Sequence, residues 1–404
     1  MNRCNSDTDG IVRMEKGVMA FLRATPLAAR FLLGVTMTAA DDLKYMQRAL
    51  ELAKNAEGDT SPNPMVGCVF VRDGKIIGEG WHHRAGGPHA EVEAMRDAKN
   101  KIRNATAYVT LELCSHVGKV GPCCVALARM GVARVVCAMV DPNPKVAGAG
   151  IKYLRDNGIP VEVGLCQKEA EALNEKFLFA ITHDRPFISL KYAMTLDGKI
   201  ATANGDSQWV TGEVARQKAH YLRKCHDAVL VGVGTVLADN PELTTRLVKG
   251  KNALRIVLDA HLQTPLTAAV INEAAKTIIF IGDNYNVSRR QALEQLEWVE
   301  VIQVPETAEG ILDLQGIMQI LSEREIRSVL VEGGSKVLGA FKDAGLVDRV
   351  YAFVAPKLCG GQDALSAVGG SGVTLMDEAL QLEELQVEQL GQDILLTAKC
   401  RGED

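Results

Sequence analysis

One histidine and two cysteines between positions 89 and 123 form a set that could hold a catalytic zinc ion: His89, Cys114 and Cys123. One imidazole and two thiolates suit Zn²⁺, and they leave its fourth tetrahedral position open for water. Zinc lowers the pKa of that water to about 7, so hydroxide becomes available at neutral pH to attack an amidine carbon. Glu91 follows the imidazole by two residues and could take the proton of the water and return it to a leaving amine. The set predicts hydrolytic deamination at a zinc ion.

Two helix starts are expected to position these side chains. Pro122 fits the first helical position before Cys123, and Gly131 fits the stop, so Cys123 would lie where the helix dipole favours a thiolate. His89 and Glu91 would not share a face in the middle of a helix. We therefore expect both at the entry turn of another helix.

Neighbouring residues have competing interpretations. A single cysteine is more often a buried apolar residue than a ligand, and a His-x-Glu pair is common by chance, so the prediction depends on the ordered combination. His116 is an alternative ligand, although three protein ligands already complete a catalytic site. Cys124 is expected in the core, and His82 and His83 are expected on the surface or around the ligands.

Length and composition limit the class of protein. A chain of 404 residues exceeds one ordinary core, so two domains are expected, and 47% hydrophobic with 24% charged residues is typical of a soluble globular protein. A net charge of −5 provides no overall basic field for nucleic acid. Ten cysteines spread over the chain, several in apolar runs, favour a reducing compartment, and hence the cytoplasm.

Residues 1–40 differ from the rest of the chain. Their apolar run, residues 20–37, is interrupted by two arginines and a proline, and it stays below the ~18 uninterrupted residues of a membrane span. The arginines suit a transit peptide, but the acidic residues do not. We expect a disordered extension, or one that translation from Met37 would omit, and no membrane contact.

Alternating patterns fill two α/β halves, which we expect to divide at Arg185-Pro186 into domains of residues 41–185 and 186–404. The first half has helical patterns and strand patterns, the latter including a hairpin around Asp73-Gly74. Its last helix is expected over residues 165–182. The strands expected in the second half are residues 187–192, 228–235, 255–259, 277–282, 301–304, 328–334 and 349–354.

A glycine pair ends one of these strands. Gly333-Gly334 opens into a helix expected over residues 336–344, so backbone N–H groups could face a phosphate-bearing cofactor. An ordinary tight turn is the more frequent explanation of such a pair. The Gly-Val-Gly-Thr run that ends at Thr235 is not a full dinucleotide fingerprint.

Motifs in both halves carry a resemblance to a known family. The first half has Pro62-Asn63-Pro64-x-Val-Gly, His89-Ala-Glu91, Cys114-Ser-His-x-Gly and Asp141-Pro-Asn-Pro-x-Val-x-Gly-x-Gly; the second has Thr195-Leu-Asp-Gly-Lys-Ile-Ala, Ser207-Gln-Trp, Val231-Gly-Val-Gly-Thr-Val-Leu-Ala-Asp-Asn-Pro-x-Leu-Thr-x-Arg246 and Val331-Glu-Gly-Gly. From Met46 to about Ala398 the chain resembles the bifunctional deaminase–reductase family of riboflavin biosynthesis. Eight residues separate its two cysteines, whereas cytidine and transfer-RNA adenosine deaminases typically have two. It departs from the family at Leu113, where Pro is usual, and at Val120-Gly121, where Thr-Pro is usual.

The resemblance implies a cytidine-deaminase-like zinc domain followed by a dihydrofolate-reductase-like α/β domain. It also implies zinc-dependent removal of the 2-amino group of a diaminopyrimidinone ribosyl phosphate, and then reduction of the ribosyl group to ribityl by NADPH. The NADPH contacts it implies are Ala193, Trp209, Thr235, Asp239, Gly334, Ser335, Lys336, Val337, Leu338, Gly339 and Ala340. The substrate contacts it implies are Asn63, Ser207, Arg223, Leu243, Arg246 and Glu332. Two arginines suit a ribose phosphate, and Trp209 could cover a nicotinamide, although each arginine alone could be a solvated surface charge.

Two other functions remain open. A nucleic-acid base deaminase fused to an unrelated reductase would need a basic groove and stacking aromatics, and a pI near 6.0 with 5% aromatic residues argues against it. A reductase whose deaminase half is only structural is suggested by Leu113 and Val120-Gly121, which loosen the loop between the thiolates without removing a ligand. The patterns do not decide whether the chain forms a homo-oligomer.

Overall fold

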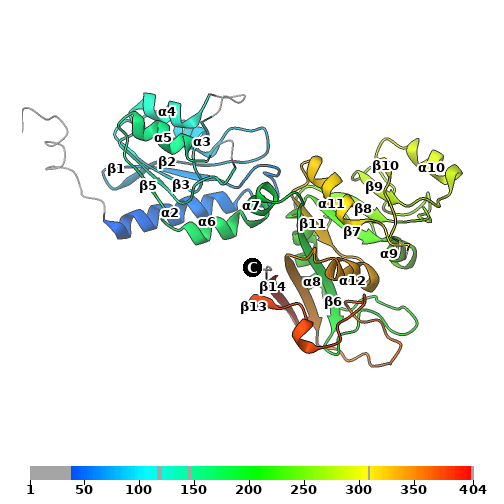
Figure 1. Ribbon diagram of the computed structural model, residues 1–404. Coiled ribbons are helices and arrows are strands. Elements are labelled where there is room, and N and C mark those ends of the chain that lie inside the picture. Colours follow the sequence, from blue (N-terminus) through cyan, green and yellow to red (C-terminus); the bar gives the residue numbers. More distant parts are fainter. Residues whose placement is uncertain (1–37, 116–120, 144–146, 308–309, 402–404) are drawn as a thin grey trace, which may run out of the picture.

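The computed structural model describes residues 38–115, 121–143, 147–307 and 310–401 (Figure 1). The expectations for residues 1–37, His116 and Val120 lie outside these ranges. Within them, no helix is long and apolar enough to span a membrane.

The first half is a five-stranded sheet between two layers of helices (Figure 1). The strand order is β2-β1-β3-β4-β5, with β3, β4 and β5 parallel and with β1 antiparallel to both of its neighbours. Buried side chains of α3, α4 and α5 pack on one face, and those of α2 and α6 on the other. The strands are β1 Gly67–Arg72, β2 Lys75–Trp81, β3 Thr106–Val109, β4 Arg134–Cys137 and β5 Val161–Val163, and these helices are α2 Ala39–Lys54, α3 Ala90–Asp97, α4 Cys123–Met130, α5 Ala149–Asp156 and α6 Gln167–Leu173.

Local sequence explains several of these boundaries. Thr38 and Asp41 form a reciprocal capping box at the start of α2. Asp73 and Gly74 both have positive φ, at 52° and 71°, which confirms the tight turn between β1 and β2. Gly131 ends α4 with a φ of 75°, as expected, whereas Pro122 is the N-cap of α4 and Cys123 is its first residue.

The single helix expected over residues 165–182 is wrong. The structure has two helices there, α6 and α7 Glu175–Thr182, separated at Asn174. The side chain of Asn174 accepts a hydrogen bond from the N–H of Met65 at 2.8 Å and donates to the carbonyl of Met65 at 2.9 Å. These long-range bonds hold Asn174 out of helical geometry, and propensity within the segment gives no sign of them.

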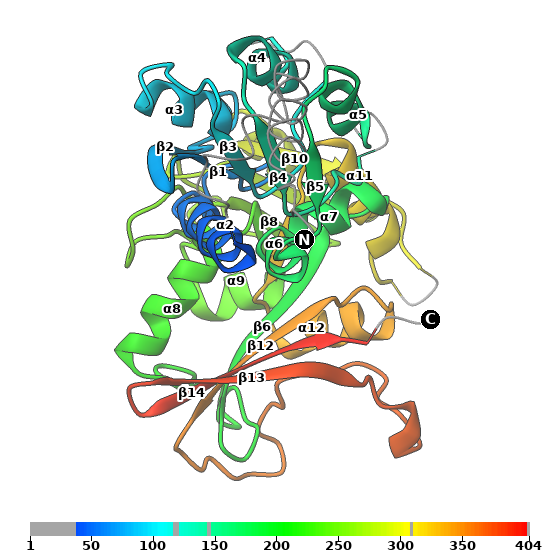
Figure 2. The same ribbon diagram turned by 90° about the vertical axis from the view of Figure 1, so that its left-hand side faces the viewer.

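The second half is a nine-stranded sheet of order β10-β9-β8-β7-β11-β6-β12-β14-β13. Seven strands are parallel, and β14 and β13 complete one edge as an antiparallel pair (Figure 2). Buried residues of α8, α9 and α10 pack on one face, and those of α11 and α12 on the other. The strands are β6 Phe187–Thr195, β7 Ala228–Gly232, β8 Leu254–Leu258, β9 Thr277–Ile281, β10 Val299–Gln303, β11 Ser328–Val331, β12 Arg349–Ala355, β13 Leu382–Leu390 and β14 Asp393–Cys400, and the helices are α8 Glu213–Lys224, α9 Val233–Asp239, α10 Val287–Glu294, α11 Leu314–Glu323, α12 Ser335–Asp343 and the 3₁₀ turn η2 Met376–Glu378.

Two features of this half differ from expectation. The strand expected over residues 228–235 ends at Gly232, and the chain turns directly into α9. The pair β13 and β14 was not predicted from the sequence. All of β13 except Leu390 is exposed, so the strand lacks the alternation of buried and exposed residues by which a half-buried strand is identified.

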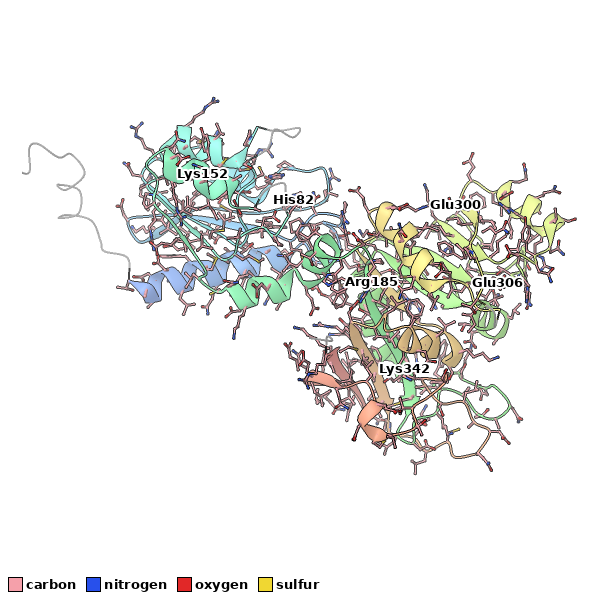
Figure 3. The ribbon with its side chains drawn as sticks, in the orientation of Figure 1. His82, Lys152, Arg185, Glu300, Glu306 and Lys342 are labelled. Carbon is pink, nitrogen blue, oxygen red and sulfur yellow. The ribbon has the colours of Figure 1, made fainter. Side chains whose placement is uncertain are left out.

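The two halves meet at α7 and the start of β6. Arg185, labelled at this junction in Figure 3, forms a two-point ion pair with Asp348 at 2.7 and 2.8 Å. Glu175, the first residue of α7, pairs with Arg349 of β12 at 2.8 Å. The first half therefore contacts the second near the amino-terminal ends of β6 and β12.

Candidate active sites

Loops from four strands of the first sheet meet at one edge and place the predicted zinc ligands there. Cys114 and Glu112 follow the carboxyl end of β3, and His82 follows β2. Because β1 runs antiparallel to β3, Asn63 and the chain entering β1 lie at the same edge. Crevices at the carboxyl ends of parallel strands are the usual ligand sites of such sheets.

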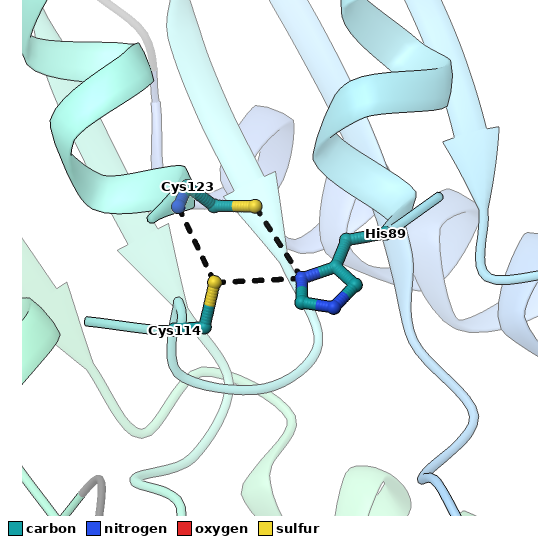
Figure 4. Close-up of side chains that lie close together, drawn as sticks. All are labelled: His89, Cys114 and Cys123. Carbon is teal, nitrogen blue, oxygen red and sulfur yellow. Dashed lines mark hydrogen bonds between the residues drawn. The ribbon is translucent and has the colours of Figure 1, made fainter. Parts of the chain in front are cut away.

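The predicted ligand atoms lie close together (Figure 4). Nδ1 of His89 is 3.4 Å from Sγ of Cys114 and 3.5 Å from Sγ of Cys123. A tetrahedral zinc ion with Zn–N and Zn–S bonds of about 2.0 and 2.3 Å would hold a nitrogen and a sulfur about 3.6 Å apart. The donor set and its spacing therefore fit zinc.

Helix starts position two of the three predicted ligands, as the sequence indicated. His89 is the N-cap of α3, and Cys123 opens α4, where its N–H points to Sγ of Cys114 at 3.3 Å. Hydrogen bonds from the Cys123 side chain and from His89 hold the pKa of Cys114 well below its usual range. These contacts favour the thiolate form of Cys114, the form that metal binding requires, whereas the hydrogen bond to Cys114 and burial raise the pKa of Cys123. Cys124 is buried in the core, as expected.

Glu91 lies beside the ligands with a buried side chain, in the first turn of α3. Burial is the main cause of its raised pKa, and the nearby His89 opposes that rise. A carboxyl group whose pKa is moved toward neutral can both accept and return a proton.

A cavity of about 260 Å³ opens over these residues and is large enough for a small ring. It is lined by Asn63, Pro64, Val66, His82, His89, Ala90, Glu91, Glu112, Cys114, Asp141, Asn143 and Phe177. The cavity brings predicted ligands, the predicted proton carrier and the predicted substrate residue Asn63 to one place.

His82 lies beside the predicted ligand His89, with ring centroids 5.9 Å apart, so of its two expected positions it takes the one around the ligands. It is buried and labelled beside the cavity loops in Figure 3, whereas His83 is exposed. Nδ1 of His82 donates to the carbonyl of Pro88 at 2.9 Å, so Nε2 must accept from the side-chain nitrogen of Asn63 at 3.1 Å. Burial also lowers the pKa of His82, which keeps the ring neutral. The histidine thereby fixes the amide orientation of Asn63.

Glu112 was not singled out in the sequence. Its Oε2 accepts from the N–H groups of Asp141 and Gly148, and its Oε1 accepts from those of Gly150 and Ile151, at 2.9–3.3 Å. The carboxylate therefore holds the loop before α5 against the cavity. An acidic residue between two apolar ones at a strand end was the only available signal.

The second half contains a buried charged cluster at the centre of its sheet. Arg223 at the end of α8 makes a two-point ion pair with Glu332 after β11, at 2.6 and 2.9 Å, and Lys191 of β6 lies 3.4 Å from the same carboxylate. The side chains of Arg223 and Glu332 are 12% and 6% exposed, so the alternative of a solvated surface charge is wrong for Arg223. Lys191 was missed because neither its strand nor its spacing marks it.

The remaining predicted reductase residues lie on a strand, helices and loops of the second half. Ser207 donates to Asp239 at the end of α9, at 3.3 Å. Trp209 is 59% exposed, and the guanidinium of Arg216 lies 4.7 Å from its ring centroid. Leu243 is buried with a φ of 53°, and Ala193 lies on β6 opposite Phe353 of β12.

Arg246 differs from Arg223 in exposure. Its side chain is 48% exposed and lies 3.7 Å from Glu242, while its backbone N–H donates to Nδ1 of His220 at 3.2 Å. Burial and the charge of Arg223 lower the pKa of His220 to about 4, so this ring is neutral near pH 7.

At the Gly333-Gly334 turn, the backbone lies so close to neighbouring residues that little room is left for a side chain on either glycine. Gly334 is the N-cap of α12 with a φ of 57°, and a Cβ there would lie 3.2 Å from Oγ1 of Thr235. A Cβ on Gly333 would lie 2.5 Å from Cα of Val231. In α12, Lys336 is exposed, Ser335, Val337 and Ala340 are half-buried, and Leu338 and Gly339 are buried. Cofactor contact by the buried pair stays a prediction.

The fold and the two sites define a zinc-type pyrimidine deaminase joined to an α/β reductase. Residues 39–139 match the cytidine and deoxycytidylate deaminase zinc-binding region, and residues 186–396 match the RibD C-terminal domain. The riboflavin biosynthesis protein RibD of Aquifex aeolicus is 44% identical over 359 residues, 89% of this chain and 98% of that protein. That of Escherichia coli is 42% identical over 368 residues, 88% and 98% of the two chains. The chain belongs to the RibD family of riboflavin biosynthesis proteins.

Solved structures agree with this assignment. Acinetobacter baumannii RibD superposes with a TM-score of 0.81 at 40% identity, over 90% of this chain and 99% of that one. The diaminohydroxyphosphoribosylaminopyrimidine deaminase/5-amino-6-(5-phosphoribosylamino)uracil reductase of Thermotoga maritima superposes with a TM-score of 0.78 at 38% identity, over the same shares.

The expected fold class and function are therefore confirmed. A cytidine-deaminase-like zinc domain precedes a dihydrofolate-reductase-like domain, and the chain is a bifunctional deaminase and reductase that acts on a small pyrimidine, with Zn²⁺ and NADPH as cofactors. A purely structural deaminase half is not favoured. Leu113, one departure from the family pattern, is fully buried and belongs to the same core cluster as Cys123.

Proposed function

We propose that Nδ1 of His89 and the Sγ atoms of Cys114 and Cys123 are the zinc ligands, and that Glu91 carries the proton of the deamination. The observation that supports this most directly is that the three ligand atoms lie within 4.8 Å of one another, at a cavity that Glu91 also lines. Bound zinc supplies the Lewis acid that activates water. Glu91, which is buried and has a raised pKa, would take one proton from water and pass it to the ring nitrogen, and would then pass the second proton of that water to the amine, which departs as ammonia.

The loops of the cavity hold the pyrimidine. Because Nδ2 of Asn63 is engaged by His82, its Oδ1 is the atom that can accept from a ring N–H. Glu112 keeps the loop that carries Asp141 and Asn143 against the other wall. The substrate of this step is 2,5-diamino-6-(5-phosphoribosylamino)pyrimidin-4(3H)-one.

In the reductase half we assign different tasks to the two arginines. Arg223 is neutralised by Glu332, so the pair, together with Lys191, suits the ribose hydroxyl groups. Arg246 is exposed and suits the phosphate. Ser207 and Leu243 complete the substrate site. NADPH supplies the reducing equivalent for the ribose C1.

The NADPH site lies around the turn at Gly334. Backbone N–H groups at the start of α12 would bind its phosphates, with Thr235 and Asp239 of α9 opposite them. Trp209 and Ala193 would flank the nicotinamide.

The division between domains is proposed at residues 185 and 186, with cytoplasmic localisation. All nine cysteines within the described ranges are free thiols, which is consistent with a reducing compartment.

Self-association is proposed through the edge strand β13, in which the side chains of Leu385 and Val387 are 63% and 65% exposed. Light scattering on the protein and on a Leu385→Glu variant tests this; a monomer at micromolar concentration contradicts it.

Mass analysis of products tests the two-step reaction. Incubation with the ribosylaminopyrimidine phosphate alone should give only the deaminated product, and addition of NADPH should give the ribityl product. Reduction of the substrate without prior deamination would overturn the proposed order.

A further inference from the structure

A short turn of the deaminase half contacts the end of a helix in the reductase half. Tyr221 of α8 donates a hydrogen bond to Oε2 of Glu57, and Nζ of Lys224 lies 3.4 Å from Oδ2 of Asp59. Between them, Gly58 lies so close that a Cβ would stand 2.5 Å from the carbonyl oxygen of Lys224. Three consecutive residues, here named the 57–59 turn, therefore contact one end of α8.

The same stretch of chain leads into the deaminase cavity. The N–H of Asp59 donates to the carbonyl of Ala56, and that of Asn63 donates to the carbonyl of Thr60, both at 2.9 Å. Asn63 and Phe177 line both the deaminase cavity and a second cavity of about 150 Å³ between the two halves. The segment from residue 57 to residue 63 is thus tied to both halves.

The end of α8 that contacts this turn also carries Arg223, which is proposed to bind the reductase substrate. Arg223 lies between Tyr221 and Lys224 in sequence, and its guanidinium pairs with Glu332 and donates to the carbonyl of Thr244 at 3.1 Å. The helix is a stiff element that rises about 1.5 Å per residue, so a shift of its last turn moves Arg223 with it. Misplacement of about 1 Å at a positioning group is enough to weaken a reactive complex strongly.

We propose that the 57–59 turn of the deaminase half is a positioning element of the reductase substrate site, because it holds the end of α8 that carries Arg223. The inference rests on the proposed role of Arg223 in substrate binding. It gives a physical reason for the two activities to share one chain: the reductase site is completed by contacts with the deaminase domain.

The test compares steady-state reduction of the deaminated substrate by the full chain and by the double variant Tyr221→Phe/Asp59→Asn. Both substitutions nearly keep the size of the side chain; the first removes the hydrogen bond to Glu57, and the second removes the negative charge that pairs with Lys224. The KM for the aminouracil phosphate should rise about 2- to 30-fold, the range expected for a network contact outside the ligand site. The kcat at saturation, the dissociation constant of NADPH, the zinc content and deamination should stay within about twofold of the parent chain, as for a change confined to one site.

Two further variants make the result decisive. Glu175→Gln removes the ion pairs with Arg349 and Lys399, which also join the halves but do not contact α8. Arg223→Gln removes the group that the turn is proposed to position. Thermal unfolding of every variant shows that it is folded, and Tyr221→Phe alone replaces the double variant if the latter unfolds.

The inference is supported if KM rises in the double variant Tyr221→Phe/Asp59→Asn and in Arg223→Gln but not in Glu175→Gln. An equal rise in Glu175→Gln would assign the effect to docking of the domains in general and would overturn the inference. An unchanged KM in the double variant, together with a raised KM in Arg223→Gln, would also overturn the inference, while leaving the substrate role of Arg223 intact. An unchanged KM in Arg223→Gln would refute that role, and the inference with it.

Discussion

Nδ1 of His89 faces the Sγ of Cys114 at 3.4 Å, although the two residues are 25 positions apart in the sequence. The contact joins the start of α3 to the loop after β3, and Cys123 at the start of α4 lies 3.5 Å from the same nitrogen. Three elements of the sheet edge thus converge on one point, with a buried carboxyl group beside them. This arrangement leads directly to predictions about the metal.

Cys114→Ser should lose the zinc and the deaminase activity, because two protein ligands rarely hold a catalytic zinc ion. Metal analysis of the purified protein should find one zinc per parent chain and well below one in the variant. Cys124→Ala is the matched control, since Cys124 is buried on α4 and its side chain is not in the ligand set. A Cys114→Ser chain with stoichiometric zinc would refute the ligand assignment.

Glu91→Gln should keep the zinc and lose deamination by a factor on the order of 10²–10⁴, because the amide cannot accept and return a proton. Reduction of substrate that is already deaminated should continue. Glu93→Gln on the same helix serves as control, since Glu93 pairs with Arg96 on a more exposed face. Near-normal deamination by Glu91→Gln would show that another group carries the proton.

Glu112→Gln should destabilise the loop before α5. Each carboxylate oxygen accepts two backbone N–H groups, so an amide must turn its NH₂ group toward two donors. The expected cost is about 1–3 kcal/mol in the free energy of unfolding, with a fall in deamination and no change in zinc content. Urea unfolding of this variant, compared with Glu162→Gln at an exposed ion pair, measures the effect. Equal stability of the two variants would remove Glu112 as the anchor of the loop.

The three candidate zinc ligands could be picked out of the sequence because their chemistry is local. The type of each ligand and the helix start near it are both written in short segments, such as Pro122-Cys123 with Gly131 as the stop. The Asp73-Gly74 turn was predictable for the same reason, since both residues tolerate positive φ.

The partners of those segments were not predictable from one sequence. Glu112 and Lys191 act through contacts with residues that are distant in the chain, and nothing in their neighbours distinguishes them from ordinary polar positions. The break at Asn174 has the same origin, because its hydrogen bonds reach Met65, 109 positions away. The pairing of Arg223 with Glu332 required the order of the sheet, in which β11 lies between β7 and β6.

Glu332→Gln should destabilise the second half by about 3–5 kcal/mol, because it leaves the buried charges of Arg223 and Lys191 without a counterion. Burial raises the pKa of Glu332, but the two cations outweigh burial and hold its pKa well below the usual range. The ionised carboxylate therefore stabilises the fold above the ordinary pKa of about 4.3, and this stability is lost as the pH falls below it.

Unfolding measured between pH 7 and pH 3 separates this charge effect from a loss of packing. The difference in stability between the parent chain and Glu332→Gln should be largest near pH 7 and should shrink as the pH falls toward 3. A difference that is independent of pH would mean that the carboxylate charge contributes nothing to the fold.

The last prediction concerns the glycine turn of the cofactor site. Gly334→Val should weaken NADPH binding, because a side chain at this helix start would project beside Thr235 and block backbone N–H groups from the phosphates. The backbone at Gly334 has a φ of 57°, so the substitution also strains the chain, by about 1–3 kcal/mol. Gly345→Val is the matched control: it lies just beyond the other end of α12 with a φ of 65°, and a Cβ there meets nothing within 4 Å. Both variants should lose stability, but only Gly334→Val should raise the dissociation constant of NADPH, by about tenfold or more if a close phosphate contact of at least about 1.4 kcal/mol is lost. Fluorescence titration of NADPH into the folded variants measures this, and equal dissociation constants for the two would place the turn outside the cofactor site.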